Sequence, residues 1–371
     1  MSFFYLLTLG VCGGYLALLM AYIIGWKKTA EYVQAKGAAC KTKVTVILPV
    51  RDEEKNIQTI LGHLSKQDYS RDQYEICVVD DMSADRTAAL TEAAGIANLK
   101  LIRLTSAGGK KQAIAEGVKH STGELIITTD ADCEMGKGWI STIVSYYETY
   151  KPVMIVGPVL LKDERSFSDI AQSQEMSVLT ALACGSLYYN RPLLCSGANL
   201  AYEKKAFHAV NGFEGIDKTP TGDDVFLMLK FNRHFKNGIK YMKSAKAAVH
   251  TTPELTPLSA IKQRKRWASK TFSYGQSYVT GVAILIFLMN FLMLLTGILS
   301  VINVKFAYAL IITLPLKCAV DIMFLLSASR FFGKKVHYAS FFIASLLYPV
   351  YVSVIGLVSP FTNFSWKGRE S

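Results

Sequence analysis

The residues with the clearest chemical potential are two aspartates, Asp130 and Asp132, separated by a single alanine. They follow a short apolar run, 124–129, that has the composition of a buried strand. Mg²⁺ or Mn²⁺ held by one or two carboxylates usually completes its shell with phosphate oxygens and water. Aspartates are also common in solvated turns. The position directly after a buried strand favours a site for a metal ion and a diphosphate.

A second acidic pair, Asp80 and Asp81, follows another apolar run at 74–79. Ser83, two residues further on, is typical of a helix cap. Two adjacent acids exceed what a cap requires, so we expect them to hydrogen-bond the base and ribose of a nucleotide. The sequence contains no Gly-x-Gly-x-x-Gly after its first strand and no P-loop motif, which argues against dinucleotide and P-loop chemistry.

Two other segments place charges at the start of expected helices. Lys110, in the run Gly-Gly-Lys-Lys at 108–111, fits either a cationic contact to phosphate or a solvated turn. Asp223 and Asp224 precede an apolar run at 225–231. They fit a helix N-terminus, where acids are favourable, and they also fit a general base that accepts the proton of an attacking sugar hydroxyl.

A basic segment near the C-terminal third carries Gln263, Arg266 and Trp267. Arginine can hold a leaving phosphate through two hydrogen bonds, and the tryptophan face suits stacking on a sugar. An interfacial helix with tryptophan at the lipid headgroups explains the same residues, so the motif alone does not decide. Lys317 and Asp321 lie four residues apart in an apolar run, and we expect them to form a structural ion pair.

These residues need a framework, and the central part of the chain alternates between strand and helix patterns. Strands are expected at 43–49, 74–79, 99–104 and 124–129, and helices at 53–67, 83–95 and 111–120. This order predicts an α/β fold with a mainly parallel, doubly wound sheet. Ligands of such sheets bind at the carboxyl ends of the strands, which is where the acidic pairs stand.

The apolar residues, 51% of the 371, are concentrated outside this central part, in runs at 3–24, 279–304, 306–329 and 338–366. Each run is long enough to cross a bilayer as a helix. The first lacks the basic leader of a signal peptide, so we expect it to be retained. Lysines and arginines cluster on the central side of the spans, which predicts a cytosolic central domain and leaves the side of the C-terminal tail open.

The predicted organisation is a multi-pass integral membrane protein of the cell inner or plasma membrane. Its parts are an N-terminal transmembrane helix at 1–28, a cytosolic catalytic domain at 29–254, an amphipathic interfacial segment at 255–278 and a C-terminal transmembrane region at 279–371. The net charge is +12. Because a basic cluster lies beside a span, we expect membrane lipid rather than nucleic acid as the anionic partner. Seven scattered cysteines without a Cys-x-x-Cys pair argue against a disulfide framework and a structural zinc site.

The order of these motifs resembles glycosyltransferase family 2, and in particular its membrane-embedded branch with cellulose, chitin and hyaluronan synthases and ceramide glucosyltransferases. The segments that carry the resemblance are 49–53 (PVRDE), 78–87 (VVDDMSADRT), 108–117, 128–133 (TTDADC), 196–207, 221–230 and 263–267 (QRKRW). The resemblance implies a GT-A-like fold and metal-dependent, inverting transfer from a nucleotide-sugar, usually UDP-linked, with Mg²⁺ or Mn²⁺ as the cofactor.

The resemblance also implies roles for individual residues. Donor contacts would come from the nucleotide-binding acids, a lysine, the metal motif and the motif before the second span: Glu53, Asp81, Lys110, Asp130, Asp132, Gln263 and Arg266. Asp224 would be the base, with Asp223 where many relatives have glutamate. Trp267 would contact the acceptor, and Cys195, Ser196 and Gly197 would shape its entrance.

The expected function is therefore sugar transfer to a polysaccharide or lipid acceptor at the cytosolic face. The Gln-x-x-Arg-Trp motif favours a processive synthase. Four spans are fewer than cellulose synthases carry, so a homo-oligomer or an export partner would be needed to complete an export channel. Two alternatives stay open: a catalytically silent membrane scaffold that binds sugar nucleotides, and a metal-dependent membrane nucleotidyl- or phosphotransferase.

Overall fold

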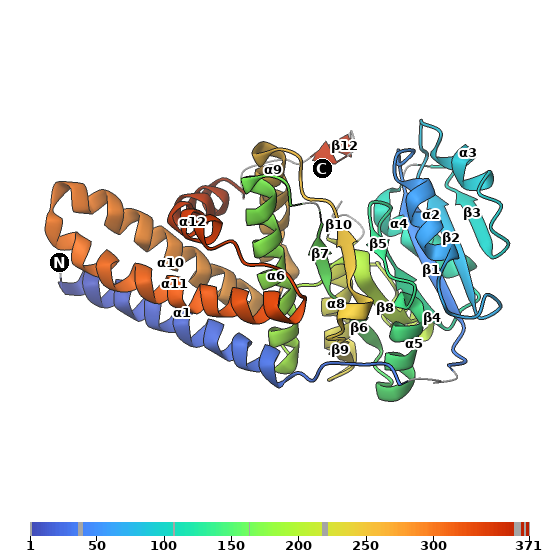
Figure 1. The fold of residues 1–371 in the computed structure, drawn as a ribbon, viewed down its shortest axis with the longest axis horizontal. Coiled ribbons are helices and arrows are strands. Elements are labelled where there is room, and N and C mark those ends of the chain that lie inside the picture. Colours follow the sequence, from blue (N-terminus) through green and yellow to red (C-terminus); the bar gives the residue numbers. More distant parts are fainter. Residues whose placement is uncertain are drawn as a thin grey trace. The chain divides into compact units, whose positions relative to one another are not determined.

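The computed structural model describes residues 2–35, 40–106, 108–162, 164–216, 222–359, 365–366 and 369–370. The chain divides into two compact units, each built from separate stretches of sequence (Figure 1). We call them the sheet unit, Thr29–Lys162 with Pro192–Thr252, and the helical unit, Met1–Lys28 with Asp163–Arg191 and Pro253–Ser371.

The sheet unit is built around a seven-stranded sheet in the order β3-β2-β1-β4-β8-β6-β9. Its strands are β1 (Val44–Val50), β2 (Tyr74–Asp80), β3 (Leu99–Arg103), β4 (Leu125–Thr128), β6 (Met154–Val156), β8 (Leu200–Glu203) and β9 (Ile239–Tyr241). Neighbouring strands are parallel except at β8, which runs antiparallel to β4 and to β6. The predicted α/β fold with a mainly parallel sheet is confirmed.

The pairing register brings the polar turns to one edge of this sheet. Val50, the last residue of β1, pairs with Asp80 at the end of β2, and Ile47 of β1 pairs with Thr128 at the end of β4. Because β8 is reversed, its first residue, Leu200, lies opposite Thr128. The turns that follow β1, β2 and β4 therefore share an edge with the segment that precedes β8.

Helices and a small second sheet complete the sheet unit. The helices are α2 (Ile57–Ser65), α3 (Thr87–Glu92), α4 (Gly109–His120), α5 (Trp139–Tyr150), α7 (Lys204–Ala209) and α8 (Asp223–His234), and the second sheet contains β5 (Glu134–Met135), β7 (Val159–Leu161) and β10 (Val249–Thr251). The apolar face of α2 is buried at Ile57, Ile60, Leu61 and Leu64, the spacing that the sequence predicts.

Two helices start later than the sequence pattern suggests. The expected starts are near 53 and 83, whereas α2 begins at Ile57 and α3 at Thr87. Asp52 and Met82 have φ angles of 51° and 57°, a left-handed conformation that a right-handed helix does not contain. The residues in between belong to turns that connect the strands to the helices.

Among the described residues, four helices are long and apolar enough to cross a membrane, and they lie in the helical unit: Phe3–Lys28, Ser277–Ile302, Val304–Phe331 and Tyr338–Val358. Its helices are α1 (Ser2–Lys28), α6 (Phe167–Tyr188), α9 (Pro257–Ala268), α10 (Ser277–Ile302), α11 (Ala307–Phe331) and α12 (Tyr338–Val358). One N-terminal and three C-terminal apolar helices agree with the prediction, although α12 ends at Val358 and residues 360–364 lie outside the described part of the chain.

Close approaches and polar contacts hold the helical unit together, and Figure 1 shows α1, α10 and α11 side by side. A Cβ atom on Gly185 of α6 would lie 2.3 Å from the backbone oxygen of Tyr22 in α1. The expected ion pair is present, since Lys317 Nζ lies 2.6 Å from Asp321 Oδ2. The Tyr15 hydroxyl of α1 donates to the other oxygen of Asp321 at 2.7 Å, which ties α1 to α11.

Candidate active site

The centre of the candidate site is Lys110, at the start of α4. Its Nζ lies 2.6 Å from Asp130 Oδ1, in the turn after β4, and 3.8 Å from Asp223 Oδ2, at the start of α8. Three segments that are distant in sequence thus place one cation between two carboxylates. The lysine and Asp223 are largely shielded from solvent, with exposed side-chain fractions of 21% and 11%.

Asp224 is anchored beside this ion pair by backbone groups. Gly197 N–H donates to Asp224 Oδ2 at 3.0 Å, and Val225 N–H donates to Oδ1 at 2.8 Å. A Cβ atom on Gly197 would lie 3.1 Å from Lys110 Nζ and 3.5 Å from Asp223 Oδ2. A glycine at this position therefore lets the backbone approach the charged groups closely.

The local charges adjust the acidities of these groups. Burial works against the charged form of Lys110, but Asp130 and Asp223 outweigh it and raise its pKa above the usual range. Burial and the negative charge of Asp223 raise the pKa of Asp224, while Lys110 acts in the opposite direction. A carboxylate with a raised pKa is better matched to proton transfer near neutral pH.

Asp132, the second aspartate of the metal motif, stays exposed to solvent. Its Oδ2 accepts a hydrogen bond of 2.8 Å from the hydroxyl of Thr251, at the end of β10. Partial desolvation and the charge of Asp130 raise its pKa. Nothing in the sequence pattern singled out Thr251, because its role depends on the pairing of β10 with β5 and β7.

The donor set suits a hard cation that brings its own additional ligands. Within the described residues no group of three or more His, Cys, Asp or Glu side chains could hold a metal ion. Two carboxylates, Asp130 and Asp132, stand in one turn, and that number fits Mg²⁺ or Mn²⁺ sites completed by phosphate and water. Since Asp130 also pairs with Lys110, Asp132 is the more accessible of the two carboxylates.

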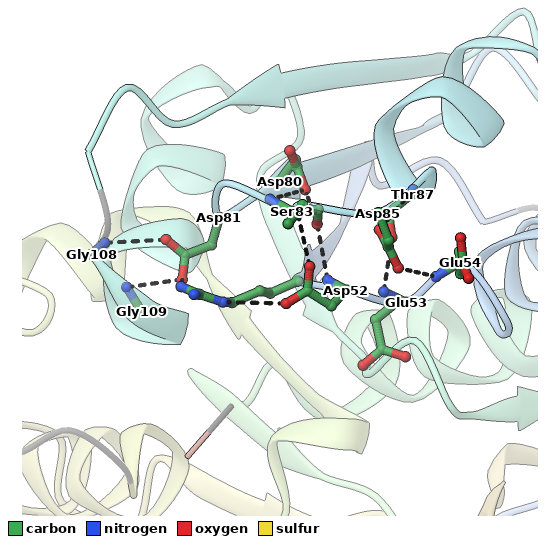
Figure 2. Close-up of polar contacts among 12 residues, drawn as sticks. Asp52, Glu53, Glu54, Asp80, Asp81, Ser83, Asp85, Thr87, Gly108 and Gly109 are labelled. Atoms are coloured by element: carbon green, nitrogen blue, oxygen red, sulfur yellow. Dashed lines mark hydrogen bonds and ion pairs between the residues drawn. The ribbon is translucent and has the colours of Figure 1, made fainter. Parts of the chain in front are cut away.

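Glu53 and Asp81, the acids that the resemblance assigns to the nucleotide, lie in the turns after β1 and β2, and Figure 2 shows Asp81 joined to Gly108 and Gly109. Asp81 is 3% exposed. Its two carboxylate oxygens accept the N–H groups of Gly108 and Gly109, at 3.1 and 3.2 Å, at the start of α4. Glu53 accepts a hydrogen bond of 2.7 Å from the Asn56 side chain. Asp81 thus connects the end of β2 to the helix that carries Lys110.

The segment before β8 contains Cys195, Ser196 and Gly197. The Thr128 hydroxyl of β4 donates to the Gly197 carbonyl at 2.9 Å, so the segment is fastened to the same strand end as the metal motif. Burial and the adjacent aspartates raise the pKa of Cys195 well above its usual range. A thiol that stays protonated is a poor nucleophile.

The remaining predicted residues lie on α9, in the helical unit. Gln263 donates to Glu254 at 2.8 Å, and Trp267 is 37% exposed. The buried arginine of this motif is Arg264, which contacts Glu175 at 2.8 Å and lies 4.8 Å from the centre of the Trp267 ring. Arg266 has no ion-pair partner among the described residues. The structure therefore brings together the sheet-unit residues of the predicted site and places the Gln-x-x-Arg-Trp motif in the other unit.

Comparison with known families places a glycosyltransferase domain in the sheet-forming part of the sequence. Residues 45–211 match the family described as Glycosyl transferase family 2. This range includes Glu53, Asp81, Lys110 and the metal motif. It ends before Asp224 and the Gln-x-x-Arg-Trp motif, and the match does not establish the membrane-embedded branch.

Curated relatives include two enzymes with lipid-related names. Beta-monoglucosyldiacylglycerol synthase of Synechocystis sp. is 25% identical over 239 residues, which cover 61% of this chain and 47% of that protein. Dolichyl N-acetyl-alpha-D-glucosaminyl phosphate 3-beta-D-2,3-diacetamido-2,3-dideoxy-beta-D-glucuronosyltransferase of Methanococcus voltae is 24% identical, over 62% of this chain and 71% of that protein. The chain thus spans less than half of the first relative.

A solved structure shares the fold over nearly the whole chain. It is the mannosyltransferase PcManGT from Pyrobaculum calidifontis in complex with GDP-Man and Mn²⁺, with a TM-score of 0.59 and 17% identity, covering 95% of this chain and 99% of that one. At this identity the likeness establishes the fold, which is of the GT-A type.

Proposed function

We propose that the protein is a membrane-embedded, inverting glycosyltransferase that moves a sugar from a nucleotide-sugar to a lipid or polysaccharide acceptor. The observation that carries this proposal is the contact of Lys110 with Asp130 and Asp223, beside a backbone-anchored Asp224. This arrangement supplies a cation for phosphate and a carboxylate for proton transfer at the carboxyl edge of a GT-A sheet, inside or just beyond a matched family 2 domain.

Asp224 is the proposed base. An acceptor hydroxyl that lies against it would attack the anomeric carbon of the sugar from the face opposite the leaving diphosphate. The new bond joins the acceptor oxygen to that carbon, the bond from the carbon to the phosphate oxygen breaks, and the proton passes to Asp224. One displacement inverts the anomeric configuration, and the raised pKa of Asp224 favours its acceptance of the proton.

The donor is proposed to lie along the turns at the carboxyl edge. Asp132 and Asp130 would hold Mg²⁺ or Mn²⁺, which would neutralise the diphosphate and improve it as a leaving group. Lys110 would add a fixed positive charge. Arg266 and Gln263 are proposed as donor-binding residues on the family resemblance of their motif alone. Glu53 and Asp81 are assigned to the nucleoside end, with a UDP-linked sugar as the expected donor.

A lipid is the acceptor that the observations favour. Four helices in the described part of the chain are long and apolar enough to cross a bilayer, and the names of the two curated relatives given above contain a diacylglycerol and a dolichyl phosphate. Trp267, partly exposed on α9, offers a flat apolar face for the acceptor. A polysaccharide acceptor would instead require long products from one donor.

The test uses the full chain, purified in lipid nanodiscs with Mg²⁺ or Mn²⁺ and a panel of UDP- and GDP-sugars. We expect release of the nucleoside diphosphate with one donor and a lipid product heavier by one or a few sugar residues. Products with many residues would make the enzyme a polymer synthase. Release of pyrophosphate from a nucleoside triphosphate, without sugar transfer, would contradict the proposal and identify a nucleotidyltransferase.

A further inference from the structure

The turn after β1, which carries Glu53, is held by side chains from the turn after β2 (Figure 2). Three consecutive backbone N–H groups are involved. The N–H of Asp52 donates to Ser83 Oγ at 3.0 Å, that of Glu53 to Thr87 Oγ1 at 2.8 Å, and that of Glu54 to an oxygen of Asp85 at 3.0 Å. These residues precede α2, so no helical hydrogen bond satisfies their N–H groups.

Each hydroxyl in this arrangement is oriented by a carboxylate. The Thr87 hydroxyl donates to Asp85 Oδ1, and the Ser83 hydroxyl donates to Asp80 Oδ1. A hydroxyl has only one proton. Once that proton points at the carboxylate, a lone pair remains for the N–H group of the opposite turn. The carboxylates therefore fix the direction in which Thr87 and Ser83 accept.

Side chains of the turn after β1 also accept hydrogen bonds from backbone groups of the turn after β2. Asp52 Oδ1 accepts the N–H of Ala84 at 2.8 Å, and Glu54 Oε2 accepts the N–H of Arg86 at 3.4 Å. The two turns are thus joined by side chain–backbone hydrogen bonds in both directions. The left-handed conformation of Met82, which has a φ of 57°, is costly for a residue with a side chain and persists within this set of contacts.

We infer that Thr87 and Asp85 are positioning residues, which hold the backbone of Asp52, Glu53 and Glu54 so that Glu53 faces the nucleotide. This inference rests on the proposed function, because it assigns the purpose of the contacts to donor binding. Neither residue needs to touch the donor. The Thr87 hydroxyl and the Asp85 carboxylate act through the backbone amide groups of the turn after β1, which carries Glu53 and is proposed to contact the donor.

The decisive variant is Thr87→Val, which keeps the side-chain shape and removes the hydroxyl. Thr87→Ser restores the hydroxyl. The matched control is Thr91→Val on the same helix, because Thr91 is also buried and its hydroxyl donates to the Thr87 carbonyl within α3, at 2.8 Å, rather than to the opposite turn. Asp85→Asn tests the carboxylate, since an amide offers one accepting oxygen in place of two.

Two measurements are made on the full chain in nanodiscs. The first is amide hydrogen exchange of residues 50–56, and the second is the Kd for UDP or GDP with Mn²⁺, together with the split of the donor KM and kcat. We expect Thr87→Val to accelerate the exchange and to weaken nucleotide binding about tenfold, with a smaller change in kcat. Thr87→Ser should restore both values, Asp85→Asn should resemble Thr87→Val, and Thr91→Val should match the wild type.

Several outcomes would overturn the inference. Unchanged exchange in Thr87→Val would show that the contacts do not hold the turn. Accelerated exchange with an unchanged Kd would show that the turn does not serve donor binding, and equal effects of Thr87→Val and Thr91→Val would reduce the result to packing of α3. A wild-type chain that binds neither UDP nor GDP would instead refute the proposed function. The hydrogen-exchange data would still show whether Thr87 holds the turn.

Discussion

Lys110 makes the ion-pair contacts that join the turn after β4 to the start of α8 in the candidate site. Its ammonium pairs with Asp130 at 2.6 Å and lies 3.8 Å from Asp223. Both partners lie more than ten residues away in sequence, so the ion pair depends on the pairing of β1 with β4 and on the position of α8. The lysine therefore serves two purposes in our account: it stabilises the crowded carboxylates and it presents positive charge to the leaving diphosphate.

The charge of Lys110 also sets a pH dependence. Asp224 must be deprotonated to act as a base, and its pKa is already raised by burial and Asp223. Lys110 lowers that pKa, so Lys110→Gln should raise it further and move the acidic limb of the kcat/KM profile to higher pH. We also expect turnover to fall about a hundredfold, the scale for losing one preorganised electrostatic contact.

The control for this experiment is Lys119→Gln, on the exposed side of the same helix, where Lys119 pairs with Glu116 at 3.1 Å. Its pH profile should match that of the wild type. An acidic limb that stays in place in Lys110→Gln, or moves to lower pH, would contradict the proposed coupling between Lys110 and Asp224.

At the scale of elements, the sequence predicts the first four strands of the large sheet well and the starts of α2 and α3 poorly. The buried, β-branched runs at 44–50, 74–80 and 125–128 are typical of strands and of no other element. In a parallel sheet, the acidic turns that follow these strands are expected at one edge. The starts of α2 and α3 depend on Thr87, Asp85 and Ser83, whose hydrogen bonds to the opposite turn compete with helix formation. Such contacts join distant segments, and no local pattern reveals them.

Helix α6, in the helical unit, is likewise not predictable from a local sequence pattern. It contains 22 residues, but polar and small side chains such as Gln172, Ser173 and Ser177 are buried along with Leu182. An amphipathic pattern is absent because the helix is covered on more than one side. The position of α8 and the reversal of β8 are equally non-local, so the link between Lys110 and Asp223 could be expected only through a family resemblance.

The close packing of α6 on α1 gives an element-scale prediction. Gly185→Ala would place a Cβ atom 2.3 Å from the backbone oxygen of Tyr22, which the helices can relieve only by moving apart. We expect a loss of about 1–3 kcal/mol in the free energy of unfolding, as for other overpacked positions. Thermal unfolding of the full chain in detergent measures this loss as a lower Tm.

Gly13→Ala on α1 is the matched control, because a Cβ atom there would have no neighbour within 4 Å. Its Tm should equal that of the wild type or exceed it slightly, since alanine favours helix more than glycine does. Equal Tm values for Gly185→Ala and Gly13→Ala would show that the approach of α6 to α1 is not as close as the structure indicates.

For the whole molecule, the distribution of charge and apolar residues predicts the topology. Lys27 and Lys28 end α1, and a basic segment at 262–270 precedes α10. By the positive-inside rule we predict that both basic segments lie on the cytosolic side of the membrane, and that the sheet unit is cytosolic as well. In sealed vesicles with the cytosolic face outward, an added protease should digest the sheet unit. Digestion only after the membrane is permeabilised would reverse the assignment.

The central claim is that this chain transfers a sugar with Asp224 as the base. The most direct test compares wild type and Asp224→Asn in the same nanodiscs, measuring the donor Kd and the rate of glycolipid formation. We expect the Kd to stay within about twofold and the rate to fall by about 10²–10⁴, the range for loss of a general base. An exposed acid remote from the site, Asp72→Asn, should change neither value. Near-normal transfer by Asp224→Asn would contradict the account.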